Sequence, residues 1–171
     1  MNNYFRILLI SLLTISIQSC MTTAQLSDFS RTSDGLDFNE IAISKNDTTD
    51  AEWNGRTEFE YYIKTVVTVD SLIIKAIKSG LNSEKFSIKL NSKNNCTILG
   101  ERGMTFNEYN SIAGVYYQIN SASSEIYINC KITQDMTGGW REDRAKKIGL
   151  KICKLLNGCE QSYSVRTRWK K

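Results

Sequence analysis

The sequence predicts an α+β domain of two layers, in which two amphipathic helices pack on one face of an antiparallel sheet of about four to five strands. Residues 57–69 alternate apolar and polar side chains, which is typical of a half-buried strand. Apolar residues at helical spacing follow Asp70 and Asp143. Between these two stretches, short turns separate four more alternating segments, and short connections favour an antiparallel meander.

The first strand is expected over residues 57–69, where Phe59, Tyr61 and Ile63 share one face. A helix over residues 59–79 also fits the apolar spacing and stays open as the alternative. We expect Asp70 to cap the first helix and Gly80 to end it. Its apolar stripe consists of Leu72, Ile73, Ala76 and Ile77.

Four strands are expected next, because alternating apolar residues recur between polar turns. They are centred on residues 86–90, 96–102, 111–120 and 126–132. The second helix begins with Glu142 and Asp143, and its lysines come later, which suits the helix dipole. Gly158 is expected to close it. Its buried stripe consists of Ala145, Ile148, Ile152, Leu155 and Leu156.

The composition excludes several kinds of site. The 171 residues include no His, which removes the Ser-His-Asp triad, the Cys-His dyad and the His-containing zinc sites. The chain also lacks the phosphate-binding, dinucleotide-binding and nucleophile-elbow motifs. We therefore expect no enzyme activity, no metal and no cofactor. Glu58 and Glu60 could share one strand face as a carboxylate pair, and an exposed polar face is the alternative.

The first twenty residues are typical of an export signal. Arg6 precedes an apolar run, Ile7–Ile17, which is about half as long as a membrane span requires. The run ends in Ile17-Gln18-Ser19-Cys20, which resembles the lipobox of bacterial lipoproteins. The resemblance implies cleavage between Ser19 and Cys20 and a lipid, with acyl chains such as palmitate, on Cys20. Gln18 departs from the small residue usual there, and an ordinary export signal is the alternative.

The resemblance also predicts a location, the bacterial cell envelope. The residue after Cys20 is Met21 and not Asp, which by the sorting rule of Gram-negative lipoproteins points to the outer membrane, facing the periplasm. In that oxidising compartment the other four cysteines are expected to form two disulfides. A Cys96–Cys130 bond would be strained in a meander, but the pairing otherwise stays open. These four are Cys96, Cys130, Cys153 and Cys159.

Four segments follow from these observations: a signal peptide (1–19), a lipidated Cys with a flexible acidic tether (20–55), a compact domain (56–160) and a basic C-terminal tail (161–171). A short strand over Leu36–Ile43 is allowed within the tether. About thirty-five flexible residues would span roughly 30–35 Å, which would hold the domain clear of the lipid.

Charge is uneven along the chain. Residues 20–62 contain nine acidic and three basic residues, whereas residues 131–171 contain eleven basic and four acidic ones. This asymmetry indicates either two solvated faces, attracting each other within the monomer, or a basic surface that meets an anionic partner. The tail is a candidate for binding a protein or lipid headgroups, with a solvated terminus as the alternative; export argues against nucleic acid. Its candidate residues are Arg166, Arg168, Trp169, Lys170 and Lys171.

The sequence thus predicts a lipid-anchored, non-catalytic envelope lipoprotein that is attached to the membrane through Cys20. Its periplasm-facing domain is expected to bind another envelope component, most simply a protein, in assembly, as a scaffold or in sensing. The alternative is a periplasmic immunity-type protein that binds and neutralises a delivered toxin. A hydrolase of envelope polymers that uses Glu58 or Glu60 is a third hypothesis.

Overall fold

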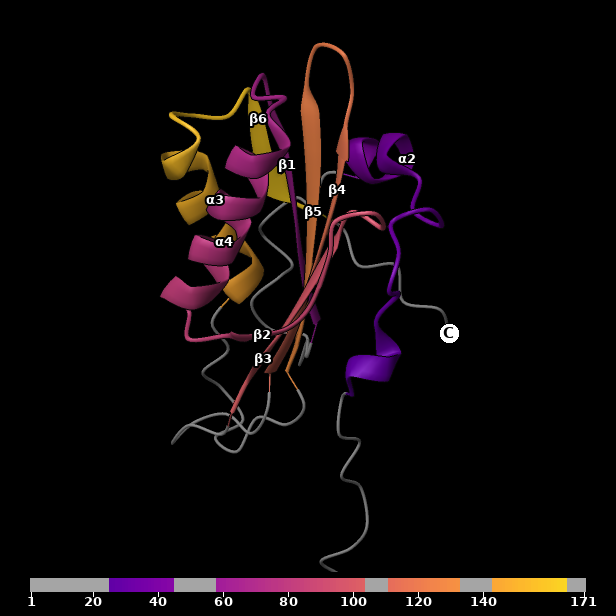
Figure 1. Cartoon of the computed structure of the whole chain (residues 1–171), viewed down its shortest axis with the longest axis vertical. Helices are drawn as coiled ribbons and strands as arrows, with labels where there is room; N and C mark the ends of the chain where they lie inside the picture. Colours follow the sequence, from indigo (N-terminus) through magenta and orange to yellow (C-terminus); the bar gives the residue numbers. More distant parts are fainter. Residues whose placement is uncertain (1–24, 45–57, 104–110, 133–142, 166–171) are drawn as a thin grey trace, which may run out of the picture.

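The computed structural model describes residues 25–44, 58–103, 111–132 and 143–165 (Figure 1). These residues form one antiparallel sheet with helices on both of its faces, which confirms the α+β class. Among them, no helix has both the length and the apolar character that crossing a membrane requires. The signal peptide and the lipobox lie outside the described residues.

The sheet has six strands in the order β2-β3-β4-β5-β1-β6, one more than the upper limit expected. The additional strand, β6, comes from the segment expected to be a tail, and it pairs antiparallel with β1, placing Tyr163 opposite Tyr62. This pairing satisfies backbone groups along β1 that would otherwise form an open edge. The strands are β1 (Glu58–Thr65), β2 (Ser87–Ser92), β3 (Thr97–Arg102), β4 (Ser111–Ile119), β5 (Ser124–Ile132) and β6 (Gln161–Ser164).

The region after β1 shows that residues 59–79 are not one helix. The strand ends at Thr65, and the helix α3 spans Asp70–Ser83. Asp70 is the first helical residue and not the cap, which is Val69. Gly80 does not end the helix as expected, since α3 continues to Ser83. A Cβ at Gly80 would lie only 2.9 Å from Ile152 Cγ1. The glycine therefore permits close packing of α3 on the second long helix.

That second helix is α4, which spans Arg144–Leu155 and runs antiparallel to α3 on the same face of the sheet, called here the helix face. Asp143 caps α4 by accepting a hydrogen bond from the Lys146 amide at 2.8 Å. Two residues assigned to the buried stripes, Leu72 and Leu155, are instead exposed. The largest fully buried side chains between helices and sheet include Ile63, Ile73, Ile77, Ile126, Ile128 and Ile148.

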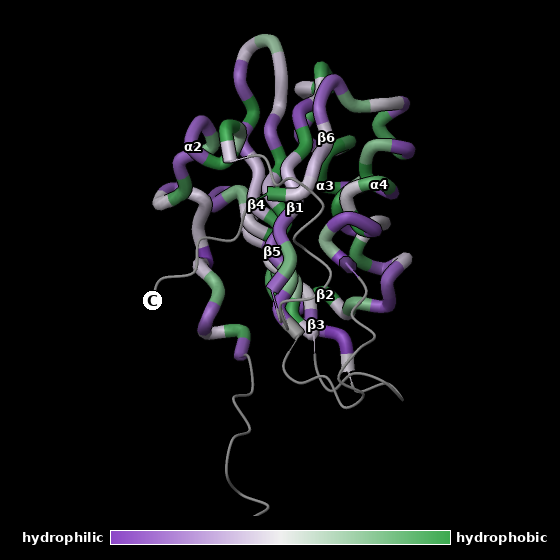
Figure 2. The backbone as a smooth tube through the Cα atoms, turned by 180° about the vertical axis from the view of Figure 1, so that it is seen from behind, coloured by the Kyte–Doolittle hydropathy of each residue, from purple (hydrophilic) through white to green (hydrophobic). Residues whose placement is uncertain are grey.

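The opposite face of the sheet is covered by residues 25–44, which we call the strap, and this face is the strap face (Figure 2). The strap contains a 3-10 helix, η1 (Leu26–Asp28), and a short helix, α2 (Phe38–Ile43). The expectation of a flexible tether over 20–55 is therefore wrong for residues 25–44, and the strand allowed over 36–43 is a helix. The Asp37 carboxylate caps α2 by accepting from the Asn39 and Glu40 amides at 3.0 and 3.1 Å.

Burial of apolar rings explains why the strap packs down. Phe29 and Phe38 are 5% and 4% exposed and lie on the strap face. Successive side chains of a strand point to opposite faces of the sheet, so large rings also lie on the strap face. These rings are tyrosines, and the strap shields them from water. The rings under the strap are those of Tyr62, Tyr116 and Tyr127.

Candidate functional site

Several candidate residues from the sequence lie outside the described residues. They include the cleavage and lipidation residues Ser19 and Cys20. They also include the tail residues Arg166, Arg168, Trp169, Lys170 and Lys171.

The cysteines of the domain form one disulfide and not the two expected. Cys153 near the end of α4 is bonded to Cys159, which ties this helix to the chain that enters β6, and the two Cα atoms are 5.3 Å apart. Cys96 and Cys130 are free thiols. The geometric objection to joining them is confirmed, since Cys96 precedes β3 and Cys130 lies toward the far end of β5, two strands away.

The free thiols have little nucleophilic character. Burial raises the pKa of both, and of Cys130 well above its usual value, so the thiolate is disfavoured. Cys130 packs among the apolar side chains of the helix face. A role in packing accounts for it.

The outer side of the two long helices is strongly basic. Helices α3 and α4 together contain six lysines and one acidic residue, Asp70, while their remaining cation, Arg144, is buried and pairs with Glu84 at 2.8 Å. Buried stripes hold the helices on the sheet, so the lysines are left on the side away from it. We call this side the basic surface, and its lysines are Lys75, Lys78, Lys146, Lys147, Lys151 and Lys154.

A hollow of about 620 Å³ lies on this surface, between α3 and strand β2. Lys75 and Lys78 line it from α3, and Lys93 lines it from the β2–β3 turn. Lys93 pairs with Asp70 at 2.7 Å, whereas no carboxylate of the described residues lies within ion-pair distance of Lys75 or Lys78. The remaining lining residues are mostly polar: Ser71, Ile74, Ser79, Asn82 and Asn91.

The strap face carries the opposite charge. The strap contains four acidic residues and one basic residue, Arg31. Glu58, Glu60 and Glu125 belong to the same face through the alternation of β1 and β5. The sheet thus separates the acidic strap from the basic surface, and these two groups of charges do not face each other within the monomer.

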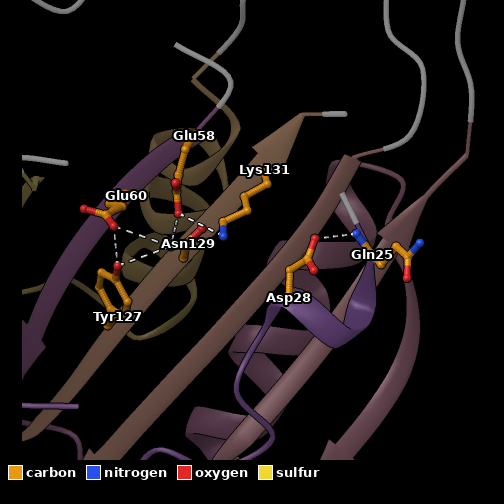
Figure 3. A network of polar contacts seen from close by, with 7 residues as sticks. All are labelled: Gln25, Asp28, Glu58, Glu60, Tyr127, Asn129 and Lys131. Carbon is orange, nitrogen blue, oxygen red and sulfur yellow. Dashed lines mark hydrogen bonds and ion pairs between the residues drawn. The ribbon is translucent and has the colours of Figure 1, made fainter. Parts of the chain in front are cut away.

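Glu58 and Glu60 do lie on one face, but donors from strand β5 surround them (Figure 3). The Asn129 side-chain amide donates to Glu58 Oε1 at 2.7 Å and to Glu60 Oε1 at 3.4 Å. The Tyr127 hydroxyl donates to Glu60 at 2.6 Å, and Lys131 Nζ lies 3.5 Å from Glu58. Burial and the neighbouring carboxylates raise the pKa of Tyr127, which stays a donor.

The same cluster supports the start of the strap. Lys131 Nζ lies 5.2 Å from the centre of the Phe29 ring, a cation–π distance. Asp28, drawn beside it in Figure 3, accepts from the Gln25 amide at 2.8 Å and closes the turn of η1. These contacts give the two glutamates a structural role, and they leave both carboxylates engaged with donors.

A third carboxylate of the strap face, Glu125, is 7% exposed and is enclosed by donors. It accepts from the Tyr62 hydroxyl, from the Gln118 amide and, at 3.4 Å, from the Asn120 amide. Burial and this carboxylate raise the pKa of Tyr62. A buried carboxyl group held by several donors stabilises one arrangement of the face, and it does not present a reactive group to solvent.

The chain matches no model of a known protein family and no curated protein sequence. Since the cysteines and the carboxylates have structural roles, the basic surface is the candidate functional site. The basic character of the second helix was visible in the sequence. Lys75 and Lys78, three residues apart on α3, give a weaker signal because apolar residues dominate that helix, and only the fold places Lys93 beside them.

Proposed function

We propose that this chain is a lipid-anchored, non-catalytic lipoprotein of the bacterial cell envelope, held in the outer membrane by Cys20. Its periplasm-facing domain binds an acidic envelope protein through the basic surface. The lipobox resemblance at Ser19-Cys20 supports the anchor. The lysines of α3 and α4 are the single observation that supports an acidic partner.

Separation of charge makes this surface suited to a partner. Within one protein, opposite charges that face each other satisfy each other, but here the sheet lies between them. Complementary charge raises association rates and excludes partners of the wrong sign, more than it adds affinity. The basic surface therefore selects for an acidic protein. The C-terminal tail, whose Arg166 directly follows the last described residue, supplies further cations and one aromatic anchor, Trp169.

Capture on membranes tests the proposal. The acylated full-length protein is crosslinked in its own membrane fraction, and the bound protein is identified by mass spectrometry. We expect the variant Lys151→Glu/Lys154→Glu to lose most of the captured partner, and the wild-type complex to weaken as salt is raised. Asp34→Lys, an exposed strap position, is the matched control and should capture normally.

Equal capture by wild type and the α4 variant, with unchanged thermal unfolding of both, would contradict a partner on the basic surface. The identity of the partner separates the assembly role from the alternative role. An envelope component points to assembly, whereas an exported toxin, bound one to one, points to immunity.

A further inference from the structure

We infer that the domain lies directly against the membrane, with the end of the sheet beside η1 turned toward the lipid headgroups. This inference rests on the lipid anchor of the proposed function and adds an orientation to it. It follows from the packing of the strap, which leaves almost no chain between the anchor and the domain.

The strap is fixed to the sheet along its length. Phe29 and Phe38 are buried, the Tyr116 hydroxyl donates to the Ser30 carbonyl at 3.1 Å, and the Ser33 amide donates to the Asn95 carbonyl at 3.1 Å. At the end of the strap, the Tyr163 hydroxyl donates to the Ala42 carbonyl. These contacts remove residues 25–44 from any spacer between lipid and domain.

The remaining spacer is short whatever its conformation. Four residues, Met21 to Ala24, separate Cys20 from Gln25. Five residue steps reach at most about 18 Å when fully extended. A spacer of about thirty-five flexible residues would instead have allowed roughly 30–35 Å. Gln25 therefore cannot lie farther than about 18 Å from the Cys20 backbone.

The position of Gln25 decides which end faces the lipid. Phe29 lies over Gly114 and near Lys131, close to where β4 begins and β5 ends. From there the strap runs along the sheet to α2, at the other end of the strap (Figure 1). The Ala42 carbonyl of α2 accepts from the Tyr163 hydroxyl of β6. Strands of nine residues are about 30 Å long, so the β4–β5 turn lies far from Gln25. We call the end where β4 begins the proximal end and the end with this turn the distal end.

This orientation has a consequence for partner binding. The helices run roughly along the strands, so the basic surface stands on the flank of the domain and stays accessible (Figure 1). Val66, which follows β1, and Ile119, the last residue of β4, are 63% and 36% exposed. Both lie at the distal end, away from the lipid. The proximal end is the part that the membrane covers.

Fluorescence quenching in vesicles tests the orientation. The native Trp53, Trp140 and Trp169 are replaced by Phe, and a single Trp is introduced at Ser27, near the proximal end, or at Ser121, in the β4–β5 turn; both positions are exposed. The full-length acylated protein is bound to vesicles of phosphatidylethanolamine and phosphatidylglycerol that contain a lipid with a nitroxide on its headgroup. We expect the nitroxide to quench Ser27→Trp several-fold more than Ser121→Trp.

A linker variant is the matched control. Twenty Gly/Ser residues inserted between Ala24 and Gln25 add roughly 25 Å of flexible reach and should abolish most of the difference in quenching. Equal quenching at the two positions, in a protein that carries the acyl mass on Cys20 and floats with the vesicles, overturns the orientation alone. A chain that lacks the acyl mass and does not float overturns the anchor and the orientation together.

Discussion

The two faces of the sheet are covered in different ways. On the helix face, two long helices bury isoleucines against the sheet in a mainly apolar layer. On the strap face, twenty residues with little regular structure cover tyrosines and carboxylates. The charge of the outer surface is also opposite, basic over the helices and acidic over the strap.

The long helices and the strap differ in how far their own structure depends on the sheet. A helix of fourteen residues such as α3 carries its own backbone hydrogen bonds and a continuous apolar stripe. Helix α2 has six residues, which is too short to be stable in isolation. Its formation therefore requires the sheet. We expect the helix face to control global stability and the strap to open locally.

The largest expected effect tests this division on the helix face. Ile148 is fully buried between α4, α3 and the sheet. Ile148→Ala leaves a cavity that the rigid sheet cannot fill, and it should lower the free energy of unfolding by about 2–5 kcal/mol. Chemical denaturation followed by circular dichroism measures this loss.

The matched variant on the strap face is Phe38→Ala. We expect the amides of residues 30–44 to exchange much faster with solvent, while those of β4 and β5 remain protected. Hydrogen exchange with mass spectrometry resolves these segments. If Phe38→Ala instead speeds exchange throughout the sheet as Ile148→Ala does, the strap is part of the global folding unit and the comparison fails.

The disulfide is the next test, since both of its cysteines pack against the core of the helix face. The bond between Cys153 and Cys159 closes a loop of six residue steps, and loop-closure entropy assigns it about 2 kcal/mol. Cys153→Ser/Cys159→Ser should lose this amount, and reductant should destabilise the wild type equally. Cys96→Ser is the control. Reductant that lowers the stability of the double variant as well would indicate a second disulfide.

The elements predicted from the sequence were those with their own periodicity. Strand β1, both long helices and the meander were visible because alternation or a helical stripe marks each of them. The strap was missed because its two buried rings, Phe29 and Phe38, are isolated among polar residues. Single apolar residues have no period, and only the sheet that receives them shows that they are buried.

The contacts of the candidate site residues could not be predicted from the sequence for a similar reason. Glu58 and Glu60 were correctly placed on one face, but their donors Tyr127 and Asn129 come from a strand more than sixty residues away. The sequence does not predict strand β6, because its four residues, Gln161–Ser164, are polar and too few to show alternation. Pairing with β1 decides its structure, and pairing is not a local property.

The stability of the protein should fall at alkaline pH because of a tyrosine on the strap face. Burial raises the pKa of Tyr116 to about 12, from an ordinary value of 10. Above pH 10 the unfolded tyrosine loses its proton while the folded one keeps it, so the unfolded state binds fewer protons and stability falls as pH rises. Below pH 10 this loss is absent.

Tyr116→Phe removes one such group. At pH 11 the loss relative to pH 8 should be smaller than in wild type by about 1 kcal/mol. Denaturation curves at the two pH values measure the difference. The variant also lacks the bond to Ser30, which lowers its stability equally at both values and cancels in the comparison. An unchanged difference between pH 8 and pH 11 would show that Tyr116 does not keep its proton in the folded state.

The smallest effect concerns the ion pair beside the strap. The side chains of Lys131 and Glu58 are 29% and 25% exposed, so solvent screens their 3.5 Å contact. Lys131→Met should cost no more than about 1 kcal/mol, including the contact with the Phe29 ring, and part of the cost should disappear at high salt. Lys151→Met on the basic surface, where no described carboxylate lies within ion-pair distance, should cost nothing measurable. Equal losses from the two variants would mean that this pair contributes no more to strap docking than a solvated lysine does, and that the buried rings and the hydrogen bonds of the strap hold it down.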